Sequence, residues 1–333
     1  MKIIVVGAGL AGSVAARLLT DAGHRVEIFE SRGHIGGNCY DAWQDGVMVH
    51  QYGPHCLHTD KPAVWEFVNR FTKFRETACA VVANTRLGQI PIPFNDVSAE
   101  IAGDLSPDEI RDLLFVDYSE KHWGVPWAEI PRAITGRVPQ RRVGRDCRYH
   151  LDQWQGVPLQ GFTKMFEAML EGIPVHLNST EEEWRNAPAD HVIFTGSIDD
   201  YFAKSFGVLE YRSLEFEYTL EAKREHFQIN ECNREKAWTR AVDHSHWLEQ
   251  QVDQTVIARE FPCEWDGTNV RFYPKPFGGN PEKFQKYWEA AKTERGVTFL
   301  GRLATYKYLD MDDVVAQVMT KLGSVTAGEI VAF

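Results

Sequence analysis

The sequence predicts an α/β fold: a parallel sheet built from βαβ units, into which a helical unit and a unit of antiparallel strands are inserted. Three observations support this prediction. An apolar run over residues 2–6 meets a Gly-x-Gly-x-x-Gly turn and continues as a helical pattern. A second apolar run, over 25–29, follows that helix and ends in Glu30. Between 208 and 275, several stretches alternate apolar and polar residues, which is typical of antiparallel strands.

The glycine turn predicts a dinucleotide-binding site. Gly7 permits the tight turn, Gly9 lets the backbone approach a pyrophosphate, and Gly12 lets the helix pack closely on the strand. Ala11 belongs to the same turn and is included in the predicted site. The pyrophosphate is expected at the helix N-terminus, where free N–H groups and the helix dipole favour an anion. Glu30 lies in the window expected for bonding an adenosine ribose.

The segment that follows Glu30 favours a flavin over NAD as the cofactor. In the run from Ser31 to Asn38, the adjacent glycines Gly36 and Gly37 let the backbone lie against a bulky group. This run resembles the second fingerprint of FAD enzymes with the glutathione-reductase-type fold. We therefore expect an FAD-binding, Rossmann-like domain, with Ser31, Gly37 and Asn38 among its cofactor contacts.

Composition excludes several classes of function. The 333 residues carry a net charge of −11, so no overall basic field exists to bind nucleic acid. No run of 18 apolar residues is present, so we expect no membrane span. The N-terminus has the pattern of a core strand and not that of a signal peptide. The six cysteines form no Cys-x-x-Cys pair, which favours reduced thiols in a cytoplasmic protein.

Four side chains that could bind a metal lie close together in the sequence. They are His50, His55, Cys56 and His58. Their spacing matches no strong zinc pattern, so we expect no metal site.

The remaining elements follow from apolar spacing and turn residues. Ser106 and Pro107 predict a helix start, as N-cap and first helical residue, within a helical segment over 95–135. Pro91 and Pro93 mark an edge strand or an extended entry to the next unit. The other expected elements are helices over 62–71, over 163–170 and from about 312, strands over 74–87, 89–94, 174–177 and 191–195, and a last strand with a glycine turn over 297–302.

These elements suggest three units, of which the first is discontinuous in sequence. The FAD-binding unit is expected to comprise 1–70, 172–207 and 294–333. A small helical unit covers 95–135. An antiparallel-sheet unit that contacts the substrate combines 72–94, 137–171 and 208–293.

Aromatic and arginine residues recur outside the nucleotide-binding part, although singly each would be an ordinary core or surface residue. Their order along the chain resembles the UDP-galactopyranose mutase family over nearly its whole length. The strings that carry the resemblance are Gly36-Gly37-Asn38, YGPHCLHT (52–59), IPFN (92–95), YSEKHWG (118–124), Arg148-Tyr149, WQGVP (154–158), GFTK (161–164), LEYRSL (209–214), GRLA (301–304) and YLDM (308–311).

The resemblance implies a flavin-dependent isomerase of carbohydrate biosynthesis. Members of the family interconvert the pyranose and furanose forms of a nucleotide-linked galactose, UDP-galactopyranose and UDP-galactofuranose. Reduced FAD attacks the anomeric carbon through N5 and displaces the nucleoside diphosphate, which returns after the sugar ring has opened and reclosed. No net redox change occurs. The protein supplies position and stabilises the charge of the leaving group.

The resemblance also assigns roles to individual residues. Arg137 and Arg240 would clamp the diphosphate, and His58 would act beside the flavin ring. The other implied substrate contacts are Tyr118, Ser119, Trp123, Tyr149, Arg212, Tyr273 and Tyr308. The other implied FAD contacts are His55, Cys56, Val175, Arg302, Leu309, Asp310 and Met311. Asp310 and Met311 precede the last helix, whose N-terminal N–H groups would stabilise an anionic reduced flavin.

Two departures from the family leave the substrate open. Only 22 residues separate Asn95 from Tyr118, where bacterial members carry a longer helical segment, and Ala78 stands where the family carries a polar substrate contact. Uridine, guanosine or deoxythymidine as the nucleoside, and galactose or a related hexose, therefore stay open. A homodimer is one option for the assembly, and the oligomeric state stays open as well.

Two other functions remain as alternatives. A flavin amine oxidase or desaturase on the same fold would need an apolar substrate tunnel, in which a buried arginine pair would be costly. A non-enzymatic escort protein on this fold would bind a partner and no flavin.

Overall fold

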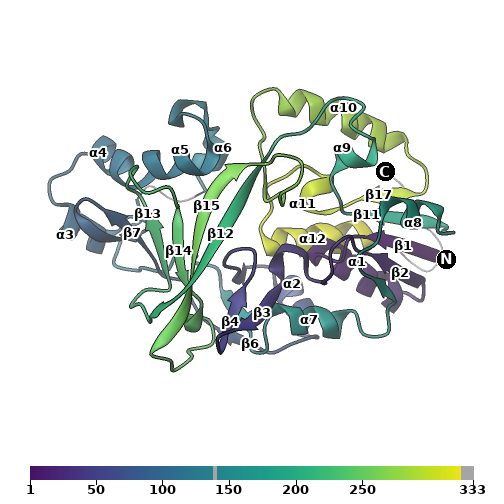
Figure 1. Cartoon of the computed structure of the whole chain (residues 1–333), viewed down its shortest axis with the longest axis horizontal. Helices are drawn as coiled ribbons and strands as arrows, with labels where there is room; N and C mark the ends of the chain where they lie inside the picture. The colour runs from purple at the N-terminus through teal and green to yellow at the C-terminus, as the bar shows by residue number, and fades with distance from the viewer. Residues whose placement is uncertain (138–140, 324–333) are drawn as a thin grey trace.

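The computed structural model describes residues 1–137 and 141–323 of the chain (Figure 1). Two large sheets dominate it, a parallel one at the right of Figure 1 and a mixed one at the left. The predicted domain segments 137–171 and 294–333 include residues 138–140 and 324–333, which lie outside the described residues.

The parallel sheet is the predicted nucleotide-binding layer. Its order is β10-β2-β1-β11-β17, and each adjacent pair is parallel. Its strands come from three distant parts of the chain: β1 (Lys2–Val6), β2 (Arg25–Phe29), β10 (Val175–His176), β11 (His191–Phe194) and β17 (Val297–Phe299). The return of the chain to this sheet near 175, 191 and 297 is as the sequence predicted.

Helices cover both faces of this sheet, which explains why most residues of its central strands are apolar. Ile3 and Val5 on β1 pack into a core with α1 (Leu10–Asp21) and α12 (Met311–Leu322). Ile4 points to the other face and packs with α8 (Glu181–Asn186), α9 (Ile198–Tyr201) and α10 (Asn280–Thr293). The alternation of buried residues to opposite faces is the period of two of a strand.

The mixed sheet has the order β16-β12-β15-β14-β13-β7-β8. Its strands are β7 (Val81–Thr85), β8 (Gly88–Ile92), β12 (Tyr211–Ala222), β13 (Gln228–Glu231), β14 (Arg240–Asp243), β15 (Gln254–Glu264) and β16 (Tyr273–Pro274). The prediction of a purely antiparallel sheet was wrong at one place, because β7 and β13 pair in parallel. These two strands are joined by a long connection that contains the helical unit, and a parallel pair requires such a crossover. Pro91 lies on β8 at the sheet edge, as predicted.

The helical unit lies beside β7 and β13 (Figure 1). It comprises α3 (Asp96–Ala102), α4 (Pro107–Arg111), the π-helical η2 (Asp112–Val116), α5 (Asp117–Trp123), the 3-10 turn η3 (Trp127–Glu129) and α6 (Arg132–Thr135). The predicted helix start is confirmed, since Ser106 forms a capping box with Glu109 and Pro107 is the first helical residue. Leu114 of η2 packs against Ile90 and Phe94, which fixes the unit on the sheet edge.

Shorter elements complete the fold. A three-stranded sheet has the order β5-β9-β6, and β3 and β4 form a hairpin. These and the remaining elements are η1 (Gly37–Cys39), β3 (Asp41–Gln44), β4 (Val47–His50), β5 (Leu57–Thr59), α2 (Pro62–Val68), β6 (Phe74–Glu76), β9 (Trp154–Pro158), α7 (Phe162–Met169), η4 (His244–His246) and α11 (Gly301–Ala304).

The local predictions hold except in two segments. The strand expected over 74–87 is two strands, β6 and β7, which belong to different sheets. The glycine turn expected after the last strand is the short helix α11, which begins at Gly301. Among the helices of the described residues, none has the length and apolar character needed to cross a lipid bilayer.

Candidate active site

A cavity of about 590 Å³ opens at the carboxyl end of the parallel sheet. This is the edge at which nucleotides bind in doubly wound folds. Most of the predicted cofactor contacts line it: Gly7, Gly9, Ala11, Glu30, Ser31, Gly37, Asn38, His55, Arg302, Leu309 and Met311. Segments that are hundreds of residues apart in the sequence thus meet around one elongated space.

The backbone that lines this cavity fits a dinucleotide because glycines stand where the chain turns and leave no side chain in the way of the ligand. Gly7 has a φ of +103°, and a Cβ added at Gly12 would lie 1.8 Å from the Gly7 carbonyl oxygen. A Cβ at Gly37 would lie 2.9 Å from the Gly9 Cα. Gly9 is the N-cap of α1 and offers no side chain to the helix, so the first N–H groups of α1 are free to bind an anion. These features fit the diphosphate of FAD.

Glu30 lies where β2 ends and its side chain is buried. Its carboxylate accepts hydrogen bonds from the Ala8 N–H at 2.7 Å and from the Arg32 N–H at 2.8 Å. The Arg32 side chain in turn donates to Asn38 at 3.0 Å. The carboxylate is therefore fixed beside the glycine turn, at the position the sequence predicted for a ribose contact.

A second cavity, of about 520 Å³, adjoins the first. The two cavities share five lining residues: Asn38, His55, Phe272, Arg302 and Met311. The second cavity lies between the helical unit and the mixed sheet, and the predicted residues that line it are Cys56, His58, Tyr118, Ser119, Trp123, Arg137, Tyr149, Arg240, Tyr273, Tyr308 and Asp310. The predicted diphosphate clamp and the predicted tyrosines therefore surround one space that is continuous with the cofactor cavity.

Arg240 stands on the buried side of the second cavity, at the start of β14. Its Nε donates to the Tyr118 hydroxyl at 2.9 Å and lies 3.5 Å from the Glu260 carboxylate. Burial opposes the charge of the guanidinium, but Glu260 and Tyr118 together raise the pKa of Arg240 well above its ordinary value. Burial raises the pKa of Glu260, and Arg240 partly offsets that rise. Arg240 is thus a fixed cation with few protein partners.

Arg137 stands on the more exposed side of the same cavity. Its guanidinium donates to both carboxylate oxygens of Asp310 at 2.6 Å and to the Tyr308 carbonyl at 3.2 Å. It also lies over the Tyr308 ring, 4.1 Å from the ring centre. The nearby Arg302 donates to the carbonyls of Leu309 and Phe272. The segment just before α12 therefore accepts hydrogen bonds from two arginines of the site, Arg137 and Arg302.

Three tyrosines of the cavity are neutral hydrogen-bond donors. Burial raises the pKa of Tyr118, Tyr149 and Tyr273 above the ordinary value for a phenol. Their hydroxyls therefore keep their protons at neutral pH and can donate to an anion. His55, in the wall between the cavities, has its pKa lowered to about 4 by burial, so its ring is neutral as well.

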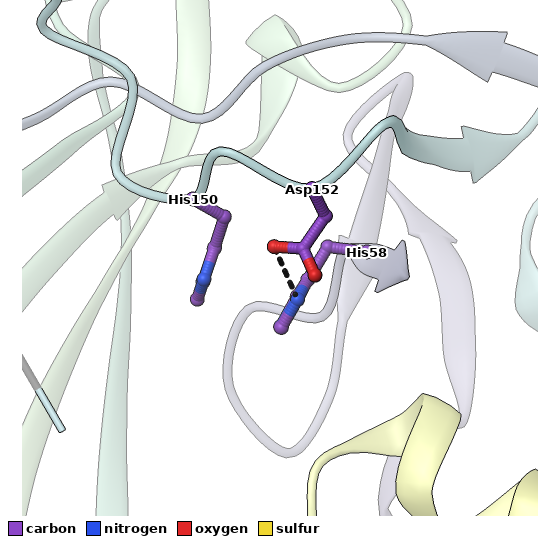
Figure 2. A group of neighbouring side chains, drawn as sticks. All are labelled: His58, His150 and Asp152. Atoms are coloured by element: carbon purple, nitrogen blue, oxygen red, sulfur yellow. Dashed lines mark ion pairs between the residues drawn. The ribbon is translucent and has the colours of Figure 1, made fainter. Parts of the chain in front are cut away.

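His58 belongs to a cluster that the sequence did not predict. Figure 2 shows His58 on β5 together with His150 and Asp152 from the segment before β9. The His58 Nδ1 lies 3.2 Å from the Asp152 carboxylate. The rings of His58 and His150 stack with centres 3.6 Å apart and planes at 11°. Pairing of His58 with Gln155 across β5 and β9 brings the three together.

The stacked rings are unsuited to sharing a metal ion. The ligand atoms of His58, His150 and Asp152 lie within 4.8 Å of one another. A ring nitrogen binds a metal close to the plane of its ring at about 2 Å. Two nearly parallel rings 3.6 Å apart cannot both meet that condition at one point. Burial and the neighbouring His58 instead lower the pKa of His150 to about 4, which leaves its ring neutral.

Three predicted contacts are placed elsewhere. Arg212 was predicted to contact the substrate, but its buried side chain donates to the His122 carbonyl at 2.7 Å and pairs with Glu264, so it does not line the second cavity. Val175 lies in the edge strand β10 and lines neither cavity. Gly12 acts behind the wall of the first cavity, through its contact with Gly7.

Some lining residues escaped the sequence analysis. Glu260 was recognised only as part of a strand, although an acidic residue in an otherwise apolar alternation was a usable signal. His150 and Cys79 also line the second cavity. No local pattern marks either of them, because both reach the site only through the pairing of β5, β6 and β9.

Comparison with known proteins identifies the family of this chain. The sequence model of the UDP-galactopyranose mutase family matches residues 113–308, and that of an NAD(P)-binding Rossmann-like domain matches residues 5–71. A dTDP-fucopyranose mutase of Escherichia coli is 31% identical, with 96% of each chain covered. A probable UDP-galactopyranose mutase of Klebsiella pneumoniae is 32% identical over 96% of this chain and 93% of the relative.

The fold agrees as well. A crystal structure of reduced UDP-galactopyranose mutase superposes with a TM-score of 0.76, at 14% identity, over 98% of this chain and 94% of that one. Because the family model matches more than half of the 333 residues and two relatives above 30% identity span nearly all of them, the chain belongs to the UDP-galactopyranose mutase family of flavin-dependent isomerases.

Proposed function

We propose that this enzyme interconverts the pyranose and furanose forms of a nucleoside-diphosphate hexose. By their names, its relatives act on UDP-galactopyranose and dTDP-fucopyranose. One observation carries the proposal: Arg137, Arg240 and a set of tyrosine hydroxyls surround a cavity that is continuous with the cofactor cavity. Two cations and several neutral donors around one space are what a diphosphate next to a reacting sugar requires.

The first cavity holds FAD in this proposal. Gly9 and the first N–H groups of α1 bind its diphosphate, Glu30 binds a ribose, and Arg302 and Met311 lie at the flavin end. When bound and reduced, FAD supplies a nucleophilic nitrogen, N5, toward the anomeric carbon of the sugar. The N-terminus of α12 has no side-chain cap, which supports a role for its N–H groups at the flavin carbonyl.

The two arginines act on the leaving group. As the bond from the anomeric carbon to the diphosphate breaks, negative charge grows on the phosphate oxygen. Arg240 is already charged, buried and held by Tyr118, so it stabilises that charge without reorganising. Arg137 is paired with Asp310, and the diphosphate would replace that carboxylate as the partner of the Arg137 guanidinium. Tyr149, Tyr273 and Tyr308 donate further hydrogen bonds to the phosphates.

His58 acts beside the flavin in this proposal, at the end of the cavity opposite the nucleoside. Asp152 and the stacked ring of His150 restrict the orientation of its imidazole. Tyr118, Ser119 and Trp123 on α5 lie toward the nucleoside. The arginine pair also makes an amine oxidase or desaturase a weaker candidate, because the substrate of such an enzyme has no diphosphate that would bind the two guanidinium groups.

The cytoplasm is the compartment we propose, because all six cysteines are free thiols.

One experiment decides which nucleoside and which hexose the enzyme accepts. Dithionite-reduced enzyme is offered UDP-galactopyranose, dTDP-fucopyranose and a GDP-hexose under anaerobic conditions, and furanose formation is followed by chromatography. Conversion of one substrate with clear preference supports the proposal and assigns the base. Failure to convert any of them, with flavin bound and reduced, would overturn it.

A further inference from the structure

Lys121 lies outside both cavities but is held in an unusual way. Its ε-ammonium donates to four backbone carbonyls, those of Glu231, Asn233, Lys236 and Trp238, at 2.9, 3.0, 3.0 and 3.1 Å. Within the described residues it forms no ion pair with a carboxylate. An ammonium has three N–H groups, so four carbonyl oxygens at these distances enclose it as they would enclose a bound cation.

These carbonyls belong to the last residue of β13 and to the loop that leads from it into Arg240. The loop joins β13 to β14, and Arg240 is the first residue of β14. Asn230 and Arg240 are paired across the two strands, and the Glu231 N–H donates to the Thr239 carbonyl at 2.8 Å. The loop therefore closes directly before the arginine, and its last held carbonyl, on Trp238, lies only two residues away. A shift of the loop would move the guanidinium.

The lysine also belongs to the helix that carries Tyr118. Lys121 lies three positions after Tyr118 on α5, so the two occupy neighbouring positions of one helix face. The Tyr118 hydroxyl accepts the hydrogen bond from Arg240 Nε at 2.9 Å. Lys121 outside the cavity and the Arg240–Tyr118 pair within it thus both connect α5 to the same loop and strand.

We propose that Lys121 is a positioning residue that sets Arg240 and Tyr118 relative to each other and so fixes the buried half of the diphosphate site. This inference rests on the proposed function, which assigns the diphosphate to Arg240. Burial lowers the pKa of Lys121, and Glu231 partly offsets the effect. Without the ammonium, the four carbonyl groups that surround it would need other hydrogen-bond donors, such as water.

The test uses the FAD-loaded enzyme and the variant Lys121→Ala. A misplaced Arg240 should lower kcat/KM on the order of 10- to 100-fold, while the flavin absorbance is retained. The variant leaves four carbonyl oxygens around a space of the size of an ammonium ion. Added ammonium should therefore restore a large part of kcat/KM. Tetramethylammonium at equal ionic strength should not, because it is larger and has no N–H group. Sodium should restore less, because the smaller ion cannot contact all four oxygens when they are spaced for an ammonium at 2.9–3.1 Å.

Matched controls separate this role from a general contribution to folding. Arg234 lies on the same loop and pairs with Asp117 of α5 at 3.1 Å and with Glu120 of the same helix, but its side chain is 66% exposed. Arg234→Ala should therefore change kcat/KM less than 3-fold. If Lys121→Ala does not retain FAD, Lys121→Met, which keeps the apolar stem, is measured in its place.

The outcomes distinguish this inference from the proposed function. Loss of activity in Lys121→Ala that ammonium restores supports the positioning role. Unchanged kcat/KM, or a loss on which ammonium has no more effect than sodium, would overturn it. Arg240→Ala is assayed in parallel: if that variant is inactive while Lys121→Ala is normal, only the positioning role fails. If Arg240→Ala is fully active, the diphosphate assignment itself fails.

Discussion

Replacing Arg240 by alanine removes the buried guanidinium of the second cavity and leaves the lining of the first cavity unchanged. Arg240 donates to Tyr118 at 2.9 Å and lies 3.5 Å from Glu260. The variant should therefore bind FAD with an unaltered visible spectrum but lose most of its turnover.

The size of the loss follows from what Arg240 does as charge develops. Removing one preorganised donor from a charge-stabilising site costs about 3–4 kcal/mol, or 10²- to 10³-fold in rate. The variant also leaves Glu260 without its cation in a buried position. Because burial already raises the pKa of Glu260, that carboxyl can take up a proton and limit the cost to folding.

The assay measures kcat/KM of the reduced enzyme together with flavin content. Arg259→Ala is the matched control: Arg259 lies on the neighbouring strand β15, pairs with Glu221 at 2.6 Å and lines neither cavity. The control should stay within 3-fold of the parent enzyme. An Arg240→Ala enzyme that is equally active would refute the role assigned to this residue.

Three further predictions concern the fold around the site. Gly12→Ala should prevent accumulation of folded, FAD-loaded protein, because the added Cβ would lie 1.8 Å from a backbone atom. Gly9→Ala should fold but lose affinity for FAD, because its added Cβ would lie 3.7 Å from the nearest backbone atom. Equal flavin content in the two variants would contradict this. Arg212→Ala should lower the free energy of unfolding in urea by about 3 kcal/mol, well beyond the effect of Arg145→Ala at an exposed ion pair, and equal stabilities would count against a structural role. The free energy of unfolding should fall as the pH drops from about 6.5 toward 4, because histidines of the unfolded chain bind protons that the same histidines, buried in the folded protein, do not bind. The fall should be up to about 1.4 kcal/mol per pH unit for each such histidine. These histidines are His50, His55, His122, His150, His191 and His244. Urea unfolding at pH 7.5, 6.0 and 5.0 with saturating FAD checks this, and a flat profile would show that these side chains are accessible to protons.

Local chemistry explains what the sequence could predict. The βαβ unit was predictable because Gly7 and Gly12 meet a steric demand that no other residue meets, and Gly9 completes the spacing of the turn. The helix start at Ser106 was predictable because its capping box involves residues only three apart. The arginine and tyrosine set was assigned through the family resemblance, and most of its members do line one cavity.

The parts that could not be predicted depend on contacts between distant segments. Arg212 has the same residue type as the predicted clamp, and only its partners, the His122 carbonyl and Glu264, favour a structural role over a substrate contact. The parallel pairing of β7 with β13 depends on where the helical unit folds back. The carbonyls around Lys121 belong to a loop more than 100 residues further along, and no sequence pattern connects the two.

The central claim is that the site rearranges a nucleoside-diphosphate hexose with reduced flavin and without net redox change. The most direct test compares dithionite-reduced and air-oxidised enzyme, with equal FAD content, on the preferred substrate in the absence of any electron acceptor. We predict sustained pyranose–furanose conversion by the reduced enzyme alone, with the flavin still reduced at the end. Sustained turnover by the oxidised enzyme, or oxidation of the flavin in proportion to product, would contradict the claim.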